Sequence, residues 1–147
     1  MAIESLIKRK YLINIILAVA AAAIMVFYAL CTTSCSYLKG AILGLDLKYA
    51  GIIAMAVVVV LSLLKKDLLL LPVLSMGIGA EAFLVSFQVK NEVYCPYCLA
   101  YGVILVLLFL LNIDFRRKWT MILFAIVGLL AFVLLFKGSA MPVYAMR

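Results

Sequence analysis

Residues 92–112 read EVYCPYCLAYGVILVLLFLLN, a polar start followed by a Cys-Pro-Tyr-Cys motif and an apolar run. Proline favours the first position of a helix, because it lacks the N–H group that would be unpaired there. We therefore expect a helix over residues 96–113. If Cys95 caps this helix, Cys98 lies in its first turn. Free backbone N–H groups and the helix dipole stabilise a thiolate at that place.

Four other apolar runs of similar length accompany this one. The chain is 70% apolar and 13% charged, whereas a soluble domain is about half apolar and about a quarter charged. A helix that crosses a bilayer needs about 20 apolar residues. The sequence therefore predicts an all-α polytopic membrane protein with one integral membrane domain over residues 1–147. The expected spans are 11–30, 47–64, 68–88, 96–113 and 119–136, with short connections that make neighbouring helices antiparallel.

The net charge of +7 is interpreted as membrane topology, and no nucleic-acid partner is expected. Five crossings divide the basic residues between two sides, with five on one side and eight on the other. Basic residues favour the cytoplasmic side. The eight that we expect to be cytoplasmic are Lys8, Arg9, Lys10, Lys65, Lys66, Arg116, Arg117 and Lys118.

This orientation places all the cysteines at the extracytoplasmic face of a multi-pass protein of the cell membrane. The excess of eight basic residues over five leaves the inverted orientation open.

The four cysteines, Cys31, Cys35, Cys95 and Cys98, carry the expected chemistry. The chain has no histidine, which excludes Ser-His and Cys-His nucleophile pairs, histidine zinc sites and haem ligation by histidine. Inert disulfides, a four-thiolate zinc site and buried apolar cysteines are the alternatives. A C-x-x-C loop is so short that its disulfide constrains the unfolded chain little. We therefore expect thiol–disulfide exchange and no metal.

A dithiol inside a membrane needs an acceptor for two electrons, and the sequence has no flavin, haem or nucleotide motif. The lipid-soluble carrier available in a bilayer is a quinone. We expect one of the ubiquinone or menaquinone class, held without a covalent bond.

Two polar side chains in the apolar runs are candidates to contact this quinone. Glu81 lies about seven residues from the outer end of its span, where a carboxylate is costly and by default functional. A purely structural role, with a tyrosine or backbone partner, is the alternative. Tyr101 follows Cys98 by three residues on the same helix face. Its hydroxyl is a candidate donor to a quinone carbonyl, although tyrosine is also common at membrane interfaces.

A patch of small residues lies in the third run, where we expect close helix packing, with room for a flat ring as the second interpretation. Its members are Ser75, Gly77, Gly79 and Ala80.

These features together resemble the vitamin K epoxide reductase family, specifically its prokaryotic homologues. The similarity covers residues 11–113. It consists of two loop cysteines after the first span, Gly44 and Gly51 near the start of the second, and the Cys-Pro-Tyr-Cys-Leu-Ala sequence of residues 95–100 that opens the fourth.

The resemblance implies a four-helix bundle around a quinone, with a fifth, peripheral transmembrane helix. It implies that Cys31 exchanges with a thioredoxin-like protein acting in trans and that Cys35 passes the disulfide to Cys95. Cys98 would then face the quinone. The expected activity is that of a quinone-dependent thiol–disulfide oxidoreductase, which supports disulfide bond formation.

Two alternatives remain at this stage. The disulfide bond formation protein B family performs the same overall reaction with a four-helix bundle, but its C-x-x-C follows the first helix. The other alternative is a non-catalytic membrane subunit whose cysteines only link its outer loops.

Overall fold

Five helices account for most of the computed structural model, which describes residues 1–30, 38–92 and 94–140. The helices are α1 (Ala2–Leu30), α2 (Leu47–Leu63), α3 (Asp67–Lys90), α4 (Pro96–Asn112) and α5 (Lys118–Leu135), with a 3-10 turn, η1 (Phe115–Arg117), before α5. Each predicted span corresponds to one helix. The predicted bounds differ most for α1, which begins at Ala2 rather than residue 11.

Among the described residues, three helical segments are long and apolar enough to cross a membrane. They are Ala2–Leu30, Asp67–Lys90 and Phe115–Leu135. The other two helices, α2 and α4, are apolar and have 17 residues each. At 1.5 Å per residue they are about 25 Å long, somewhat shorter than the bilayer core of about 30 Å. The chain is thus a helical membrane protein.

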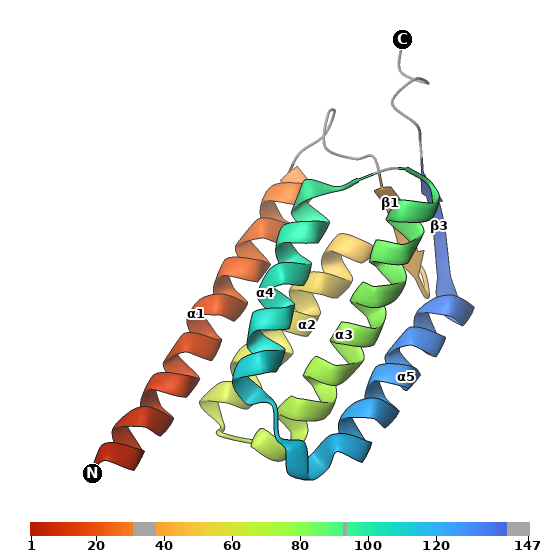
Figure 1. The fold of residues 1–147 in the computed structure, drawn as a ribbon. Coiled ribbons are helices and arrows are strands. Elements are labelled where there is room, and N and C mark those ends of the chain that lie inside the picture. The colour runs from red at the N-terminus through yellow and green to blue at the C-terminus, as the bar shows by residue number, and fades with distance from the viewer. Residues whose placement is uncertain (31–37, 93, 141–147) are drawn as a thin grey trace.

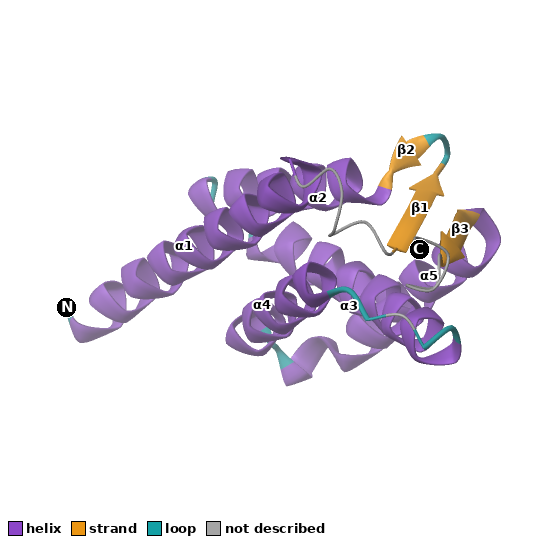
Figure 2. Ribbon diagram, turned by 90° about the horizontal axis from the view of Figure 1, so that it is seen from above, coloured by secondary structure: helices purple, strands orange, loops and turns teal. Residues whose placement is uncertain are grey.

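The helices lie side by side and alternate in direction (Figure 1). Helix α1 packs against α2 and α4, whereas α3 packs against α4 and α5. Helix α5 lies at the edge of the molecule, along α3 (Figure 1). Viewed from above, a group of strands lies at one end of the molecule, beside α2 and α5 (Figure 2).

These strands make the all-α prediction incomplete. β1 (Leu38–Ile42) lies between β2 (Leu45–Asp46) and β3 (Phe136–Ala140), and both pairings are antiparallel. The β1–β2 connection is a two-residue turn in which Leu43 and Gly44 have φ values of 52° and 85°. Both central residues of a type I′ hairpin turn need positive φ, which fits this connection. β3 continues from α5, so the chain after the fifth span returns to the segment before the second.

Four phenylalanine rings attach the sheet to the helices. Phe83 and Phe87 come from α3, Phe132 from α5 and Phe136 from β3, and their contacting ring centroids are 5.3–6.4 Å apart. These contacts include stacked, tilted and edge-to-face pairs, which are geometries that aromatic rings adopt at such separations. A Cβ atom at Gly40 in β1 would overlap the Phe136 ring, so glycine is needed for this approach.

Glycines also bring α3 and α5 into close contact, which confirms the predicted role for part of the small-residue patch. A Cβ atom at Gly79 would overlap the carbonyl oxygen of Ala125, and one at Gly128 would overlap that of Met76. Gly77 instead faces Leu105 of α4. The patch therefore allows close packing against two neighbouring helices, α5 at Gly79 and α4 at Gly77.

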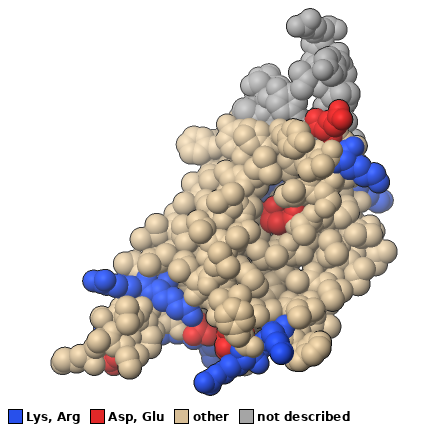
Figure 3. Space-filling view, viewed as in Figure 1, with Lys and Arg blue, Asp and Glu red and all other residues tan. Residues whose placement is uncertain are grey.

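Polar residues meet at the end of the molecule opposite the sheet. The side chains of Asn14 and Asn112 form two reciprocal hydrogen bonds of 3.0 Å between α1 and α4. Tyr11 donates a hydrogen bond of 2.8 Å to Asp67, which also lies 3.8 Å from the Lys10 ammonium. Figure 3 shows that the visible basic residues gather toward the two ends, whereas the middle of this face carries one acidic patch and is otherwise uncharged.

The α3–α5 contact gives the first prediction. Gly79→Ala should lower the free energy of unfolding by about 1–3 kcal/mol, because the added methyl group forces two backbones apart. Thermal unfolding of the detergent-solubilised protein, followed by circular dichroism, measures this. Ala82→Leu, on the exposed face of the same helix, is the control and should have little effect. Equal stability of Gly79→Ala and the unmodified chain would contradict the close packing.

Candidate functional site

The C-x-x-C motif forms the start of α4 in the predicted way. Cys95 is the N-cap residue, Pro96 occupies the first turn, and the Cys98 backbone N–H donates a hydrogen bond of 3.3 Å to the Cys95 sulfur. Both thiols are free and buried, with exposed fractions of 0% for Cys95 and 2% for Cys98. The motif therefore holds two thiols close together at a helix N-terminus.

The environment of Cys95 favours its thiolate. A hydrogen bond from the Cys98 side chain lowers the pKa of the Cys95 thiol below its usual range, and backbone N–H groups of Cys98 and Tyr97 act in the same direction. Burial opposes this shift, because it disfavours the charged form. The hydrogen bonds outweigh burial, so Cys95, and not Cys98 as the sequence predicted, is the thiol of the pair that ionises first.

Sequence reasoning missed a residue that contacts the motif. The side-chain oxygen of Gln88 accepts a hydrogen bond of 2.9 Å from the Cys95 backbone N–H. Gln88 lies in the last two turns of α3 and is 1% exposed. The only available signal was its position seven residues after Glu81, which puts the two polar side chains on one face of an otherwise apolar helix.

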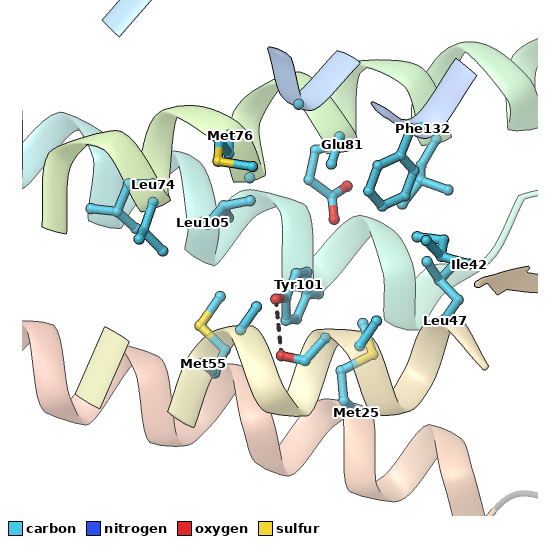
Figure 4. Close-up of a pocket in the computed structure, with 18 of the residues that line it drawn as sticks. Met25, Ile42, Leu47, Met55, Leu74, Met76, Glu81, Tyr101, Leu105 and Phe132 are labelled. Atoms are coloured by element: carbon cyan, nitrogen blue, oxygen red, sulfur yellow. Dashed lines mark hydrogen bonds between the residues drawn. The ribbon is translucent and has the colours of Figure 1, made fainter. Parts of the chain in front are cut away.

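Cys98 lies in the wall of an apolar cavity of about 360 Å³, part of which is drawn in Figure 4. All five helices and β1 contribute to the lining: Met25 from α1; Ile42 from β1; Leu47, Ala50, Gly51, Ala54, Met55 and Val58 from α2; Val73, Leu74, Met76, Gly77, Ala80, Glu81 and Leu84 from α3; Cys98, Tyr101 and Leu105 from α4; and Gly128, Ala131 and Phe132 from α5. Gly77 and Ala80 line the cavity on the α3 side, and contact of this small-residue patch with a flat ring stays a prediction.

Glu81 is the acidic residue of this lining, as its position in the third run suggested. It is 9% exposed, and its Oε2 atom has no hydrogen-bond partner among the residues that the structure describes. The carboxyl group lies beside Gly102 of α4, where a Cβ atom would come within 2.9 Å of Oε2. In Figure 4 it points from α3 toward the side of the cavity where Tyr101 lies. A buried carboxyl oxygen without a partner is costly, and a ligand in the cavity would supply one.

Tyr101 also lines the cavity, but its hydroxyl has a protein partner. It donates a hydrogen bond of 3.2 Å to the carbonyl oxygen of Gly51 in α2 (Figure 4). The hydroxyl would have to leave Gly51 to donate to a ligand, although its oxygen is still able to accept. Contact of Tyr101 with a quinone stays a prediction.

The other predicted pair, Cys31 and Cys35, lies outside the described residues. The described segments on either side end at Leu30 and begin at Leu38, and both lie at the end of the molecule where α4 starts (Figure 1). Within 1–30, 38–92 and 94–140, no group of three or more residues of the metal-binding types could hold a metal ion. A four-thiolate zinc site would need Cys31 and Cys35, so that alternative remains open.

Comparison of the chain with protein-family models, with curated proteins and with solved structures found no match.

The hydrogen bonds at Cys95 give a prediction about pH. In a chain carrying Cys31→Ala and Cys35→Ala, thiolate absorbance should appear at a pH below the usual range for a thiol. Adding Cys98→Ala removes the side-chain donor and should raise the midpoint by about one pH unit, since a hydrogen bond to a charged group is worth about 1.5 kcal/mol. The measurement is an ultraviolet pH titration. An unchanged midpoint would contradict the role of Cys98.

Proposed function

We propose that the protein is a membrane thiol–disulfide oxidoreductase that passes electrons from a thiol protein to a quinone. The observation that carries the proposal is the place of the C-x-x-C pair. Cys95 caps α4 at one end of the bundle, and Cys98, one turn further, borders an apolar cavity among the helices. A redox pair in this position adjoins one end of the bundle at Cys95 and a space for a lipid-soluble molecule at Cys98.

The proposed transfer to the acceptor balances as a two-electron reaction. The two thiols of Cys95 and Cys98 form one disulfide and release two electrons and two protons. The quinone takes up both and leaves as the quinol. Thiolate formation at Cys95 assists closure of the disulfide, because a thiolate is the nucleophile in thiol–disulfide chemistry.

The cavity residues fit a flat apolar ring with polar oxygens. Aliphatic side chains, Phe132 and the flexible thioethers of Met25, Met55 and Met76 supply an adaptable apolar wall. Glu81 supplies a carboxyl oxygen without a protein partner among the described residues. In this proposal the Glu81 Oε2 atom donates its proton to a quinone oxygen and regains one of the two protons that the Cys95 and Cys98 thiols release, so the dithiol still supplies both electrons and both protons.

Electrons would enter the pair through Cys31 and Cys35. Under the proposal, a thioredoxin-fold protein acting in trans reduces the Cys31–Cys35 disulfide, and the resulting thiols then reduce the Cys95–Cys98 disulfide by exchange. Each exchange breaks one disulfide and forms another, so electrons and protons balance. The cysteine-bearing end would face the extracytoplasmic side, where disulfides persist.

The direct test is quinone reduction by the purified protein. A reduced thioredoxin-fold protein and a soluble quinone should give quinol at a rate that depends on the chain. Cys98→Ala should reduce that rate to background, because no disulfide can close with Cys95. Ser86→Ala, which loses only a hydrogen bond within α3, is the control and should retain the rate. Absence of activity in the unmodified chain would favour a non-catalytic subunit with structural disulfides.

Replacement of Glu81 tests the proton-donating role. Glu81→Gln should lower kcat about 10²-fold with little change in the KM for quinone, because the amide still donates a hydrogen bond but transfers no proton. Glu81→Leu should lower kcat and raise KM. Glu92→Gln, at the exposed α3–α4 connection, serves as the control. Steady-state kinetics at several quinone concentrations separates these effects, and an unchanged kcat in Glu81→Gln would remove Glu81 from the reaction.

A further inference from the structure

Gln88 is the polar side chain in direct contact with the redox motif for which the proposed electron path gives no role. Its side chain is almost completely buried between the end of α3 and the start of α4. The Cys95 N–H group must donate, so the amide atom 2.9 Å from it is the acceptor Oε1. The orientation of the Gln88 amide is therefore fixed by chemistry.

The other half of this amide is unused. The Nε2 atom of Gln88 has no hydrogen-bond partner among the described parts of the chain. Because Oε1 and Nε2 belong to one planar amide, Nε2 is also held in the neighbourhood of Cys95. A buried N–H donor is retained at a cost unless some state of the protein uses it.

We propose that Gln88 is a positioning residue for the Cys95 thiol, with Oε1 holding the Cys95 backbone and Nε2 donating to its sulfur in the thiolate form. The inference rests on the proposed thiol–disulfide function of Cys95, but not on the identity of the electron acceptor. In the thiol form, the Cys98 N–H already contacts the Cys95 sulfur at 3.3 Å. A thiolate has lone pairs for further donors, and Nε2 supplies one.

The surroundings of Cys95 explain why an amide is needed. Among the described residues, the titratable groups that interact with it electrostatically are Tyr28 from α1, Glu81 from α3 and Cys98 from α4. None of these groups is a cation, and the described chain places no lysine or arginine among the interactions that shift Cys95. These neighbouring groups carry negative charge when they are ionised, so they do not stabilise a thiolate. Within the described residues, a thiolate at this site therefore depends on neutral N–H donors.

Two substitutions separate the functions of the amide. Gln88→Met fills a similar volume but removes both the acceptor and the donor. Gln88→Glu keeps an oxygen for the Cys95 N–H, loses the donor and adds an acidic group. The matched control is Asn91→Ala, because Asn91 lies in the same turn and, within the part of the chain that the structure describes, its side chain bonds only the Phe87 carbonyl.

The experiment measures thiolate formation and redox equilibrium in chains carrying Cys31→Ala and Cys35→Ala. Gln88→Met should raise the pH midpoint of the first thiolate by about one unit, because one hydrogen bond to the charged sulfur is lost. Gln88→Glu should raise it at least as much. In a redox buffer at about pH 9, above both midpoints, both variants should shift the Cys95–Cys98 equilibrium about tenfold toward the disulfide, because the Cys95 thiolate that stabilises the dithiol form is then about tenfold less favoured.

Asn91→Ala should match the unsubstituted background in both measurements. Wild-type midpoints and equilibria in folded Gln88→Met and Gln88→Glu would overturn the inference, and circular dichroism establishes that each variant is folded. If Gln88→Met fails to fold, Gln88→Glu decides alone. Quinone reduction is assayed separately in the full chain. Shifted midpoints without quinone reduction would refute the proposed acceptor and leave the role of Gln88 intact.

Discussion

The start of α4 is the constraint on which the arrangement of this protein depends. Pro96 fixes where the helix begins, and this makes Cys95 its cap and places Cys98 one turn inside. The hydrogen bond from Gln88 ties that cap to the end of α3. As a result the two thiols occupy different environments, one at the helix end and one at the wall of an apolar cavity. If the helix began one residue earlier or later, Cys95 would no longer be the N-cap residue and Cys98 would turn away from the cavity.

Helix α3 holds the start of α4 in place by using one face to contact α5 and another to contact α4. Its glycine at position 79 allows α5 to approach closely, and α5 in turn closes part of the cavity with Gly128 and Phe132. The face that carries Glu81 and Gln88 is directed toward α4 and the thiols. At the same end, the phenylalanine cluster attaches β1 and β3 to the bundle. The segment that follows the first cysteine pair is thereby tied to the helices that surround the cavity.

Much of this arrangement could be predicted from local sequence. Long apolar runs identified the five helices, and Pro96 after Cys95 identified the cap, because both signals depend on neighbouring residues. Glu81 stood out since a carboxylate inside an apolar run is costly. The sheet could not be found in this way, because β1 and β3 are about a hundred residues apart and pair through their backbones. The hydrogen bond of Tyr101 with Gly51 and that of Gln88 with Cys95 likewise depend on how the helices pack.

The central claim is that the Cys95–Cys98 dithiol gives its electrons to a quinone in the adjoining cavity. The most direct measurement adds quinone without oxygen to the fully reduced chain carrying Cys31→Ala and Cys35→Ala, and then maps disulfides by mass spectrometry while quinol is quantified. The account predicts one Cys95–Cys98 disulfide for each quinol formed. Thiols that stay reduced in the presence of excess quinone, or a disulfide that forms without quinol, would contradict it.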